Sequence, residues 1–216
     1  AIPSRNRLSQ IQEKTLALLQ RQKMSMKNVF VFVSPASYDS YAEIAGKWGF
    51  FLVNSFNSIL QTRNHIVDFF PSGAKIVEID DDVEDINVTQ KGVDNESISD
   101  LELFFHDSFR LLKGAGLWGL NANENNFYAA GEDKFGFYSI VNSCLGYFND
   151  KRILLTVPEK EDFERCIQFN LLMLPILKRT GFGIRTRYWK NKGGIQDKYD
   201  FNRRIDVQRK SAEIIM

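Results

Sequence analysis

Hydrophobic and polar positions in the first third of the chain follow two alternating patterns, one typical of strands and one typical of helices. Apolar residues recur at helical spacing in residues 40–49 and 58–70, and Gly49 and Pro71 mark the ends of these two helices. Strands that alternate with helices predict a mainly parallel sheet flanked by helices, with ligands beyond the carboxyl ends of the strands. The runs rich in β-branched and aromatic residues, which predict strands, are residues 28–34 (NVFVFVS), 50–55 (FFLVNS) and 74–79 (AKIVEI), and the first of these is expected to be buried.

Less regular patterns occupy the two ends of the chain. A short apolar start breaks at Pro3, and Ser9 is expected to cap an amphipathic helix through Gln22. Thr156 and Glu159 stand at the spacing of a capping box, which predicts a helix after them. The other expected elements are a helix at 100–113, strands at 114–128, 137–150, 152–157 and 181–190, a glycine-rich loop at 129–136 and a basic, glycine-containing loop at 191–204.

Composition indicates one large folded domain. The 216 residues are 44% hydrophobic and include 18 Phe, enough for an extensive aromatic core. Cys144 and Cys166 lack metal-ligand spacing, and we interpret them as reduced core thiols. Without an apolar stretch of membrane-spanning length or a signal-peptide pattern, we expect a soluble, cytoplasmic protein. The chain lacks an initiator Met, so we expect a processed or excised piece of something longer, such as one domain of a longer protein.

Charge is distributed unevenly along the sequence although the formal net charge is only +1. Residues 78–102 contain ten acids and one base, whereas residues 178–210 contain eleven bases and three acids. Such a division indicates an acidic site for a cation and a basic strip for an anion. Two solvated surfaces of opposite charge are the alternative interpretation.

Three consecutive acids, Asp80, Asp81 and Asp82, follow the apolar strand at 74–79 directly. Their mutual repulsion requires a positive partner. An Asp-x-Asp sequence at a strand end directs two carboxylates to one side, where Asp80 and Asp82 can bind one hard divalent cation through oxygen. Water or a substrate phosphate would complete the coordination, so the acidic segment and the basic tail are interpreted as parts of one site. A solvated acidic turn is the alternative.

Five segments resemble, in order, nucleotide-sugar glycosyltransferases of the GT-A fold, and the whole chain is most similar to glycosyltransferase domains encoded by chlorella viruses. The Asp-x-Asp element is weakly specific alone, whereas the ordered set is more specific. The segments are IPSRNR (2–7), TRNHI (62–66), IVEIDDDV (76–83), GLWGLNANENNFY (116–128) and KEDFERCIQFNLL (160–172).

This resemblance implies a GT-A (Rossmann-like) α/β domain with a mixed, mainly parallel sheet flanked by helices. Such a domain would transfer a hexose or deoxyhexose, such as glucose or rhamnose, from a UDP-sugar to a glycan hydroxyl. Asp80 and Asp82 correspond to the ligands of Mn²⁺ or Mg²⁺, and Asp81 to a ribose contact. Asp162, with Glu161 beside it, corresponds to the acidic pair that supplies the base, although acids in a first helical turn are also favoured by the helix dipole. A late histidine that completes the metal shell in many such enzymes is missing.

Further candidates for nucleotide-sugar binding rest on the same resemblance or on local chemistry. For six of them an ordinary structural role is the alternative. Arg7 would then be a solvated charge, and Arg63 and Asn64 would belong to a helix surface. Trp118 would lie in the core, and Gly193 and Gly194 would form a simple turn. The full set is Ser4, Arg5, Arg7, Arg63, Asn64, Asp81, Trp118, Asn142, Ser143, Lys192, Gly193 and Gly194.

Two other classes of protein remain as alternatives. The pattern IVEIDDDVE also fits a haloacid dehalogenase-type phosphatase, in which the first Asp is a nucleophile, but that Asp normally follows the first strand. A noncatalytic module that binds a cation or sugar is the second alternative. For the transferase, the expected partners are a UDP-sugar and a glycan or glycoprotein acceptor, with no nucleic acid, no membrane span and, for a viral protein, a host-cytoplasmic location.

Overall fold

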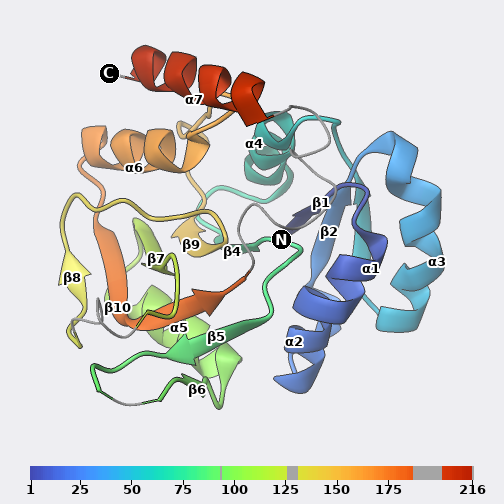
Figure 1. The fold of residues 1–216 in the computed structure, drawn as a ribbon, viewed down its shortest axis with the longest axis horizontal. Coiled ribbons are helices and arrows are strands. Elements are labelled where there is room, and N and C mark those ends of the chain that lie inside the picture. The colour runs from blue at the N-terminus through green and yellow to red at the C-terminus, as the bar shows by residue number, and fades with distance from the viewer. Residues whose placement is uncertain (93, 126–130, 187–200, 216) are drawn as a thin grey trace.

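The computed structural model describes residues 1–92, 94–125, 131–186 and 201–215. Its β-strands lie in the middle of the molecule with helices on both sides, so the chain has an α/β fold (Figure 1). Three short parallel strands form one sheet in the order β1-β2-β3. These strands are β1 (Ile2–Ser4), β2 (Phe30–Val33) and β3 (Phe51–Asn54).

A larger sheet has the order β4-β9-β7-β10-β5-β6, and β8 pairs with β10 outside this path. Within the described residues, β7 and β10 are the one parallel pair of this sheet, and its other pairs are antiparallel. Its strands are β4 (Lys75–Ile79), β5 (Asp85–Val88), β6 (Glu96–Ser97), β7 (Leu117–Asn121), β8 (Lys134–Phe135), β9 (Cys144–Phe148) and β10 (Ile176–Arg185).

Ala1 connects the two sheets. Its amino group donates to the Val77 carbonyl at 2.6 Å, and its carbonyl accepts from the Ile79 N–H at 3.1 Å. In parallel strands, the N–H and the carbonyl of one residue bond to the two residues on either side of the residue that faces it. The strand order β3-β2-β1-β4 therefore runs across the junction of the two sheets.

The expectation of a mixed sheet is confirmed. The expectation that it is mainly parallel holds for β1, β2 and β3 but is wrong for the larger sheet, in which antiparallel pairs predominate among the described strands. Parallel pairing needs a long crossover, usually a helix. In the second half, α6 precedes β10, and β10 is the strand that pairs in parallel with β7. The segment between β7 and β9 contains no described helix, and these two strands pair antiparallel.

The expected helices are present. The first begins at Leu8 with Arg7 at its N-cap, so the expected Ser9 cap is wrong, because Ser9 lies inside the helix. It is continuous to Arg21 and contains a π-helical segment, Gln12–Leu16. The helix Tyr38–Trp48 ends at Gly49, whose φ of 81° provides the left-handed termination that glycine favours. The helices are α1 (Leu8–Ile11), α2 (Ala17–Arg21), α3 (Tyr38–Trp48), α4 (Ile59–Phe69), α5 (Leu101–Leu111), α6 (Glu161–Leu171) and α7 (Phe201–Ile215), with short 3₁₀ turns at Met26–Asn28 and Pro35–Ser37.

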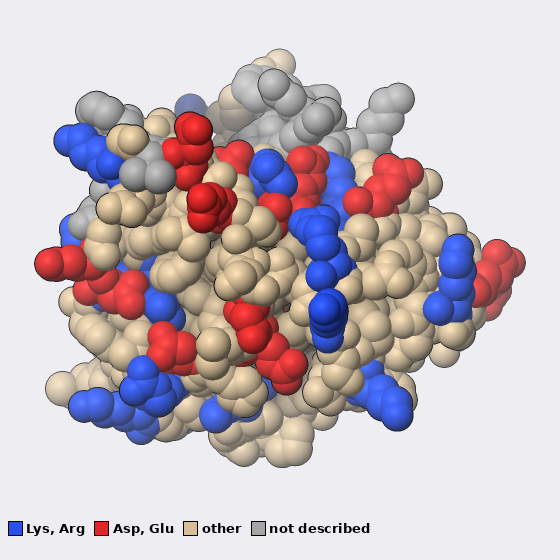
Figure 2. Space-filling model, turned by 90° about the horizontal axis from the view of Figure 1, so that it is seen from below, with Lys and Arg blue, Asp and Glu red and all other residues tan. Residues whose placement is uncertain are grey.

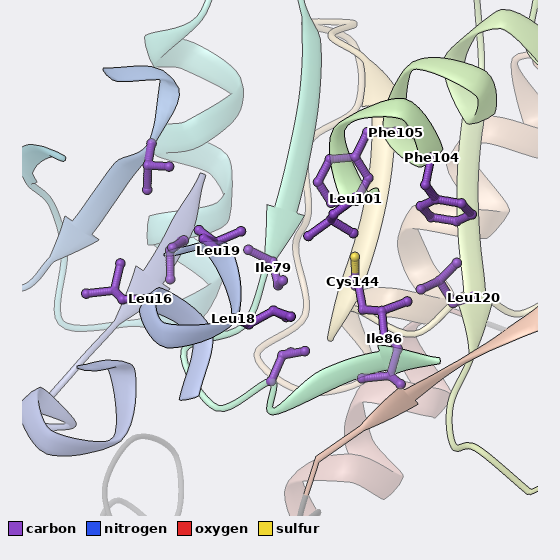
Figure 3. Close-up of a cluster of buried hydrophobic side chains, with 14 of the residues drawn as sticks. Leu16, Leu18, Leu19, Ile79, Ile86, Leu101, Phe104, Phe105, Leu120 and Cys144 are labelled. Atoms are coloured by element: carbon purple, nitrogen blue, oxygen red, sulfur yellow. The ribbon is translucent and has the colours of Figure 1, made fainter. Parts of the chain in front are cut away.

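Two hydrophobic clusters lie on opposite faces of the strands. One joins side chains of α2, α5 and the strands between them, among them Leu18, Ile79 and Phe105 (Figure 3). The other joins α4 and α6 to the strands through residues such as Ile66 and Phe169. Successive residues of a strand pack into different clusters, because side chains along a strand point alternately to its two faces. The molecule is therefore a three-layered α/β structure.

The expected strand at 152–157 is wrong. Ile153 and Leu155 are buried, but this segment is neither helix nor strand. The side chain of Asn64 donates to the Leu155 carbonyl and accepts from the Leu155 N–H, both at 2.9 Å. A side chain thus satisfies the backbone groups that a neighbouring strand would otherwise have paired.

The expected capping box is also wrong in its residues. Helix α6 begins after Lys160, whose left-handed φ is 66° and whose side chain makes no capping bond. Glu164, rather than Glu159, accepts hydrogen bonds from the Thr156 N–H and hydroxyl, at 2.8 and 2.6 Å. A carboxylate still bonds to the segment before α6, but it belongs to Glu164 in the first turn of the helix.

Several short elements were not predicted. Strands β5, β6 and β8 are two to four residues long, and α7 begins at Phe201, within the segment expected to be a basic loop. Strand β10 starts at Ile176, five residues before the expected start. No helix in the described part of the chain is long and apolar enough to cross a membrane.

The acids of the acidic segment are paired with bases from distant parts of the chain. Asp85 lies 2.7 Å from Arg185 and 3.4 Å from Arg21, and Glu84 lies 3.2 Å from Lys14. Acidic and basic side chains are interspersed on the molecular face in Figure 2. Among the described residues, folding thus compensates part of the charge of the acidic segment.

Candidate functional site

A cavity of about 510 Å³ lies at the carboxyl ends of β1 and β4. Its walls come from the segments that follow these strands, from the start of α4, from the segment before β9, and from the starts of α6 and α7. It is lined by eleven of the residues predicted from the sequence, namely Ser4, Arg5, Arg7, Arg63, Asp80, Asp81, Asp82, Asn142, Ser143, Glu161 and Asp162.

Two arginines supply the positive charge that the three aspartates require. Nη2 of Arg63 lies 2.9 Å from Oδ1 of Asp80. Nη1 of Arg7 lies 2.9 Å from Oδ1 of Asp81 and 3.2 Å from Oδ2 of Asp82. Arg7 and Arg63 are therefore integral to the acidic site and are neither solvated charge nor ordinary helix surface.

Asp81 anchors the end of β1. The Ser4 hydroxyl donates to Oδ2 of Asp81 at 2.6 Å, and the Tyr41 hydroxyl lies 2.7 Å from Oγ of Ser4. Asp81 is only 4% exposed. These contacts fix the carboxyl ends of β1 and β4 against each other and leave Asp80, whose side chain is 29% exposed, as the more accessible carboxylate.

The backbone of the acidic turn is held by three other segments. The Thr15 hydroxyl donates to the Asp80 carbonyl at 2.7 Å and accepts from the Val83 N–H at 3.1 Å. The Asp80 N–H donates to the Ser143 carbonyl at 3.0 Å, and the Thr186 hydroxyl donates to the Asp82 carbonyl at 3.0 Å. Thr15 lies in the π-helical segment, a type of irregularity frequent at functional sites.

A buried charge network supports the cavity from the core. Glu78 is fully buried, and its carboxylate lies 2.6 Å from Arg63, 2.7 Å from Arg165 and 2.6 Å from the Tyr147 hydroxyl. Burial alone would raise the pKa of Glu78, but Arg165 and Arg63 outweigh it and lower the pKa to about 2. Glu78 therefore stays ionised and fixes the position of Arg63.

The acidic pair at the start of α6 divides into one constrained and one less constrained residue. Oε1 of Glu161 accepts from Nδ2 of Asn142 at 3.1 Å and lies 3.6 Å from Nε of Arg63. Oδ1 of Asp162 accepts from the Phe163 N–H at 3.0 Å. Burial raises the pKa of both carboxyl groups. Asp162 is the member of the pair better placed to exchange a proton with a ligand.

Asp80 has the most perturbed carboxyl group of the cavity. Burial raises its pKa to about 7 in spite of Arg63, and the charges of Asp82 and Asp81 add to the increase. Ionisation of Asp80 is thus disfavoured, chiefly by burial. A bound cation would stabilise the ionised carboxylate.

The donor set fits a hard divalent cation that a ligand helps to coordinate. Among the described residues, no group of three or more His, Cys, Asp or Glu side chains could hold a metal by itself. Mg²⁺ is commonly bound by one or two carboxylates plus substrate phosphates rather than by a complete protein cage. Asp80 and Asp82, both lining the cavity, match that arrangement.

Some of the predicted residues lie elsewhere. Trp118 is fully buried and packs against Phe104 and Phe105, so the structure puts it in the core and not at a sugar. Asn64 binds the backbone of Leu155 and does not line the cavity. Lys192, Gly193 and Gly194 lie outside the described residues.

Sequence reasoning missed several residues that build the site. Glu78 precedes the aspartates within the predicted strand, and an acid at a buried strand position was the one available signal. The others act from segments whose proximity only the fold establishes. They are Thr15, Tyr41, Tyr147, Glu159, Phe163, Arg165, Thr186, Arg204 and Gln208.

No protein-family model matches the chain, and no curated protein sequence matches it significantly. The functional argument therefore rests on the geometry of the cavity.

Proposed function

We propose that the protein is a metal-dependent glycosyltransferase with a GT-A (Rossmann-like) arrangement, which transfers a hexose or deoxyhexose from a UDP-sugar to a glycan hydroxyl. The observation that carries this proposal is the position of Asp80 and Asp82. They line a cavity between β1 and β4, and the same cavity contains the acidic pair Glu161 and Asp162.

The strand order supports a nucleotide ligand. The chain proceeds outward from β1 to β3 and then returns to place β4 beside β1. In open α/β sheets, this reversal leaves a crevice at the carboxyl ends of the two central strands, and nucleotides commonly bind there. The volume of about 510 Å³ lies within the range of about 300–1,000 Å³ typical of small-molecule sites.

The acidic and basic groups suit departure of a diphosphate. A divalent ion held by Asp80 and Asp82 would neutralise charge that develops on the leaving oxygens. Arg7 and Arg63 border the same two carboxylates and would add positive charge beside them. Ser4 and Arg5, at the end of β1, line the part of the cavity next to Asp81 and are assigned to the nucleoside.

Asp162 is assigned as the general base. In the transfer step, the acceptor oxygen forms a bond to the anomeric carbon while the bond from that carbon to the diphosphate oxygen breaks, and Asp162 takes the hydroxyl proton. Glu161 is held by Asn142 and Arg63, and its role is to position the start of α6. A raised pKa makes Asp162 a stronger base than an ordinary carboxylate.

Isothermal titration calorimetry tests this proposal with UDP, UDP-glucose and UDP-rhamnose, each with and without Mn²⁺. We expect Mn²⁺-dependent binding of at least one nucleotide sugar. Stabilisation by fluoroberyllate without nucleotide binding would instead indicate a phosphatase, and binding of free sugar alone would indicate a noncatalytic module.

A further inference from the structure

One wall of the cavity is not used by the proposed donor chemistry. It consists of Glu159, Lys160 and Phe163, around the start of α6, and of Arg204 and Gln208 from α7. Helix α7 lies beside α6 at the edge of the fold (Figure 1). Helix α7, late in the chain, thus lines the same cavity as the segments that follow β1 and β4.

The polar part of this wall is a buried hydrogen-bonded group. Glu159 is only 4% exposed, and its two carboxylate oxygens lie 3.1 Å from Nε and 3.3 Å from Nη2 of Arg204. Nε2 of Gln208 donates to the same carboxylate at 3.3 Å. Two side chains one helical turn apart therefore present a fixed set of donors and acceptors to the cavity.

The apolar part is an aromatic ring beside the proposed base. Phe163 is 41% exposed although it lines the cavity, and it directly follows Asp162. Nζ of Lys160 lies 5.1 Å from the centre of its ring. Lys160 has a left-handed backbone, which is uncommon for a residue other than glycine and often found at functional sites.

We propose that this wall is the subsite for a pyranose ring of the acceptor glycan. Its identification as the acceptor side rests on the proposed function. The C–H groups of the sugar would pack against Phe163, and its hydroxyls would bond with the Glu159–Arg204–Gln208 group. This placement directs a neighbouring hydroxyl toward Asp162.

The chemistry of the wall suits a sugar better than a phosphate or a peptide. An exposed aromatic ring offers apolar area at little cost in side-chain entropy. The adjacent carboxylate, guanidinium and amide together accept and donate hydrogen bonds, as a hydroxyl requires. Because Glu159 offsets the charge of Arg204, this hydrogen-bonded group by itself has no strong preference for an anion.

The subsite is tested by nuclear magnetic resonance titration of methyl glucopyranosides, galactopyranosides and rhamnopyranosides, with and without UDP and Mn²⁺. Phe163→Ala and Gln208→Ala should each weaken binding of the preferred glycoside roughly fivefold to tenfold. The dissociation constant of UDP should change less than about twofold, since neither side chain reaches the aspartates in our assignment.

Matched variants control for general effects on the two helices. Leu171→Ala removes an exposed apolar side chain of α6 that does not line the cavity, and Arg203→Ala removes the base next to Arg204. Both should leave glycoside binding unchanged. Thermal unfolding of every variant checks that the fold is retained.

The outcomes separate the subsite from the proposed function. Unchanged glycoside affinity in both test variants, or no glycoside binding in the wild type under any condition, would overturn the subsite. Weakened UDP-glucose binding with unchanged glycoside binding would assign the wall to the donor sugar and also overturn the proposal. Glycoside binding that depends on Phe163 in a protein that does not bind UDP would support the subsite and refute the transferase.

Discussion

Arg63 and Glu78 form a buried ion pair in which Nη1 lies 2.6 Å from Oε2. The same guanidinium also lies 2.9 Å from Asp80 and 3.6 Å from Glu161. Glu78 in turn binds Arg165 from α6. One arginine thus connects the core to the acidic turn after β4 and to the start of α6, the two parts of the cavity assigned to the metal and to the acceptor.

Glu78→Gln should strongly destabilise the fold. It leaves Arg63 and Arg165 buried without their shared carboxylate, and breaking a buried pair typically costs about 3–5 kcal/mol. Urea denaturation measures the change in the free energy of unfolding. Glu84→Gln, which weakens a partly exposed contact with Lys14, should cost about 1 kcal/mol or less. Equal losses in the two variants would contradict a special role for Glu78.

The same pair predicts a dependence of stability on pH. The folded pKa of Glu78 is about 2, below its ordinary value of 4.5, so its stabilising contribution is complete above about pH 4.5 and is lost as the pH falls toward 2. Glu78→Gln should lack this component. The difference in the free energy of unfolding between wild type and variant should therefore shrink from pH 6 to pH 2.5.

The first third of the fold was predictable because its elements follow regular patterns and are separated by clear punctuation. Strand β2 is a continuous apolar run, and α3 ends at a glycine that adopts the expected left-handed conformation. The segment at 152–157 has the same apolar character, but Asn64 takes the place of a partner strand. Local sequence does not reveal such a distant contact.

The aspartates at the centre of the candidate site were predictable from the sequence for a related reason. Three aspartates at the end of a strand stand out in any sequence, and they line the cavity. Their partners do not stand out, because Arg7 and Arg63 are ordinary charged residues until the fold brings them within 3.2 Å. The opposite outcome for Trp118 shows that an aromatic residue near a motif is often simply core.

Asp80→Asn should abolish binding of Mn²⁺ and stabilise the metal-free protein above neutral pH. Because the folded pKa of Asp80 is raised to about 7, its favourable contribution exists below about pH 4 and is lost as the pH rises through 7. The variant avoids this loss, so its melting temperature should exceed that of the wild type at pH 8 but not at pH 4. Asp150→Asn, whose carboxylate pairs with the exposed Arg152, is the control. Unchanged Mn²⁺ affinity would exclude Asp80 as a ligand.

Asp162→Asn should slow sugar transfer without weakening the binding of the UDP-sugar donor. Loss of a general base typically lowers turnover by about 10² to 10⁴-fold. Glu161→Gln should instead reduce stability, since it disturbs the contacts with Asn142 and Arg63. Turnover, UDP-sugar affinity and urea denaturation distinguish the two. If Glu161→Gln alone lowers turnover while both variants remain folded, the base is Glu161.

Thr15→Val tests whether the acidic turn must be held in place to bind a cation. The substitution keeps the shape of the side chain but removes the hydroxyl that bonds to the Asp80 carbonyl and the Val83 N–H. Because Thr15 is fully buried, both backbone groups lose a partner, and we expect a loss of about 1–3 kcal/mol in the free energy of unfolding.

Mn²⁺ affinity should fall in the same variant, although Thr15 contributes no ligand in the proposed site. Thr15→Ser retains the hydroxyl and should restore most of the Mn²⁺ affinity, even if the missing methyl group leaves the protein less stable. A stability loss without any change in Mn²⁺ affinity would show that Thr15 only supports packing. Recovery of affinity in Thr15→Ser would instead show that the π-helical segment fixes the geometry of the aspartates through this single hydroxyl.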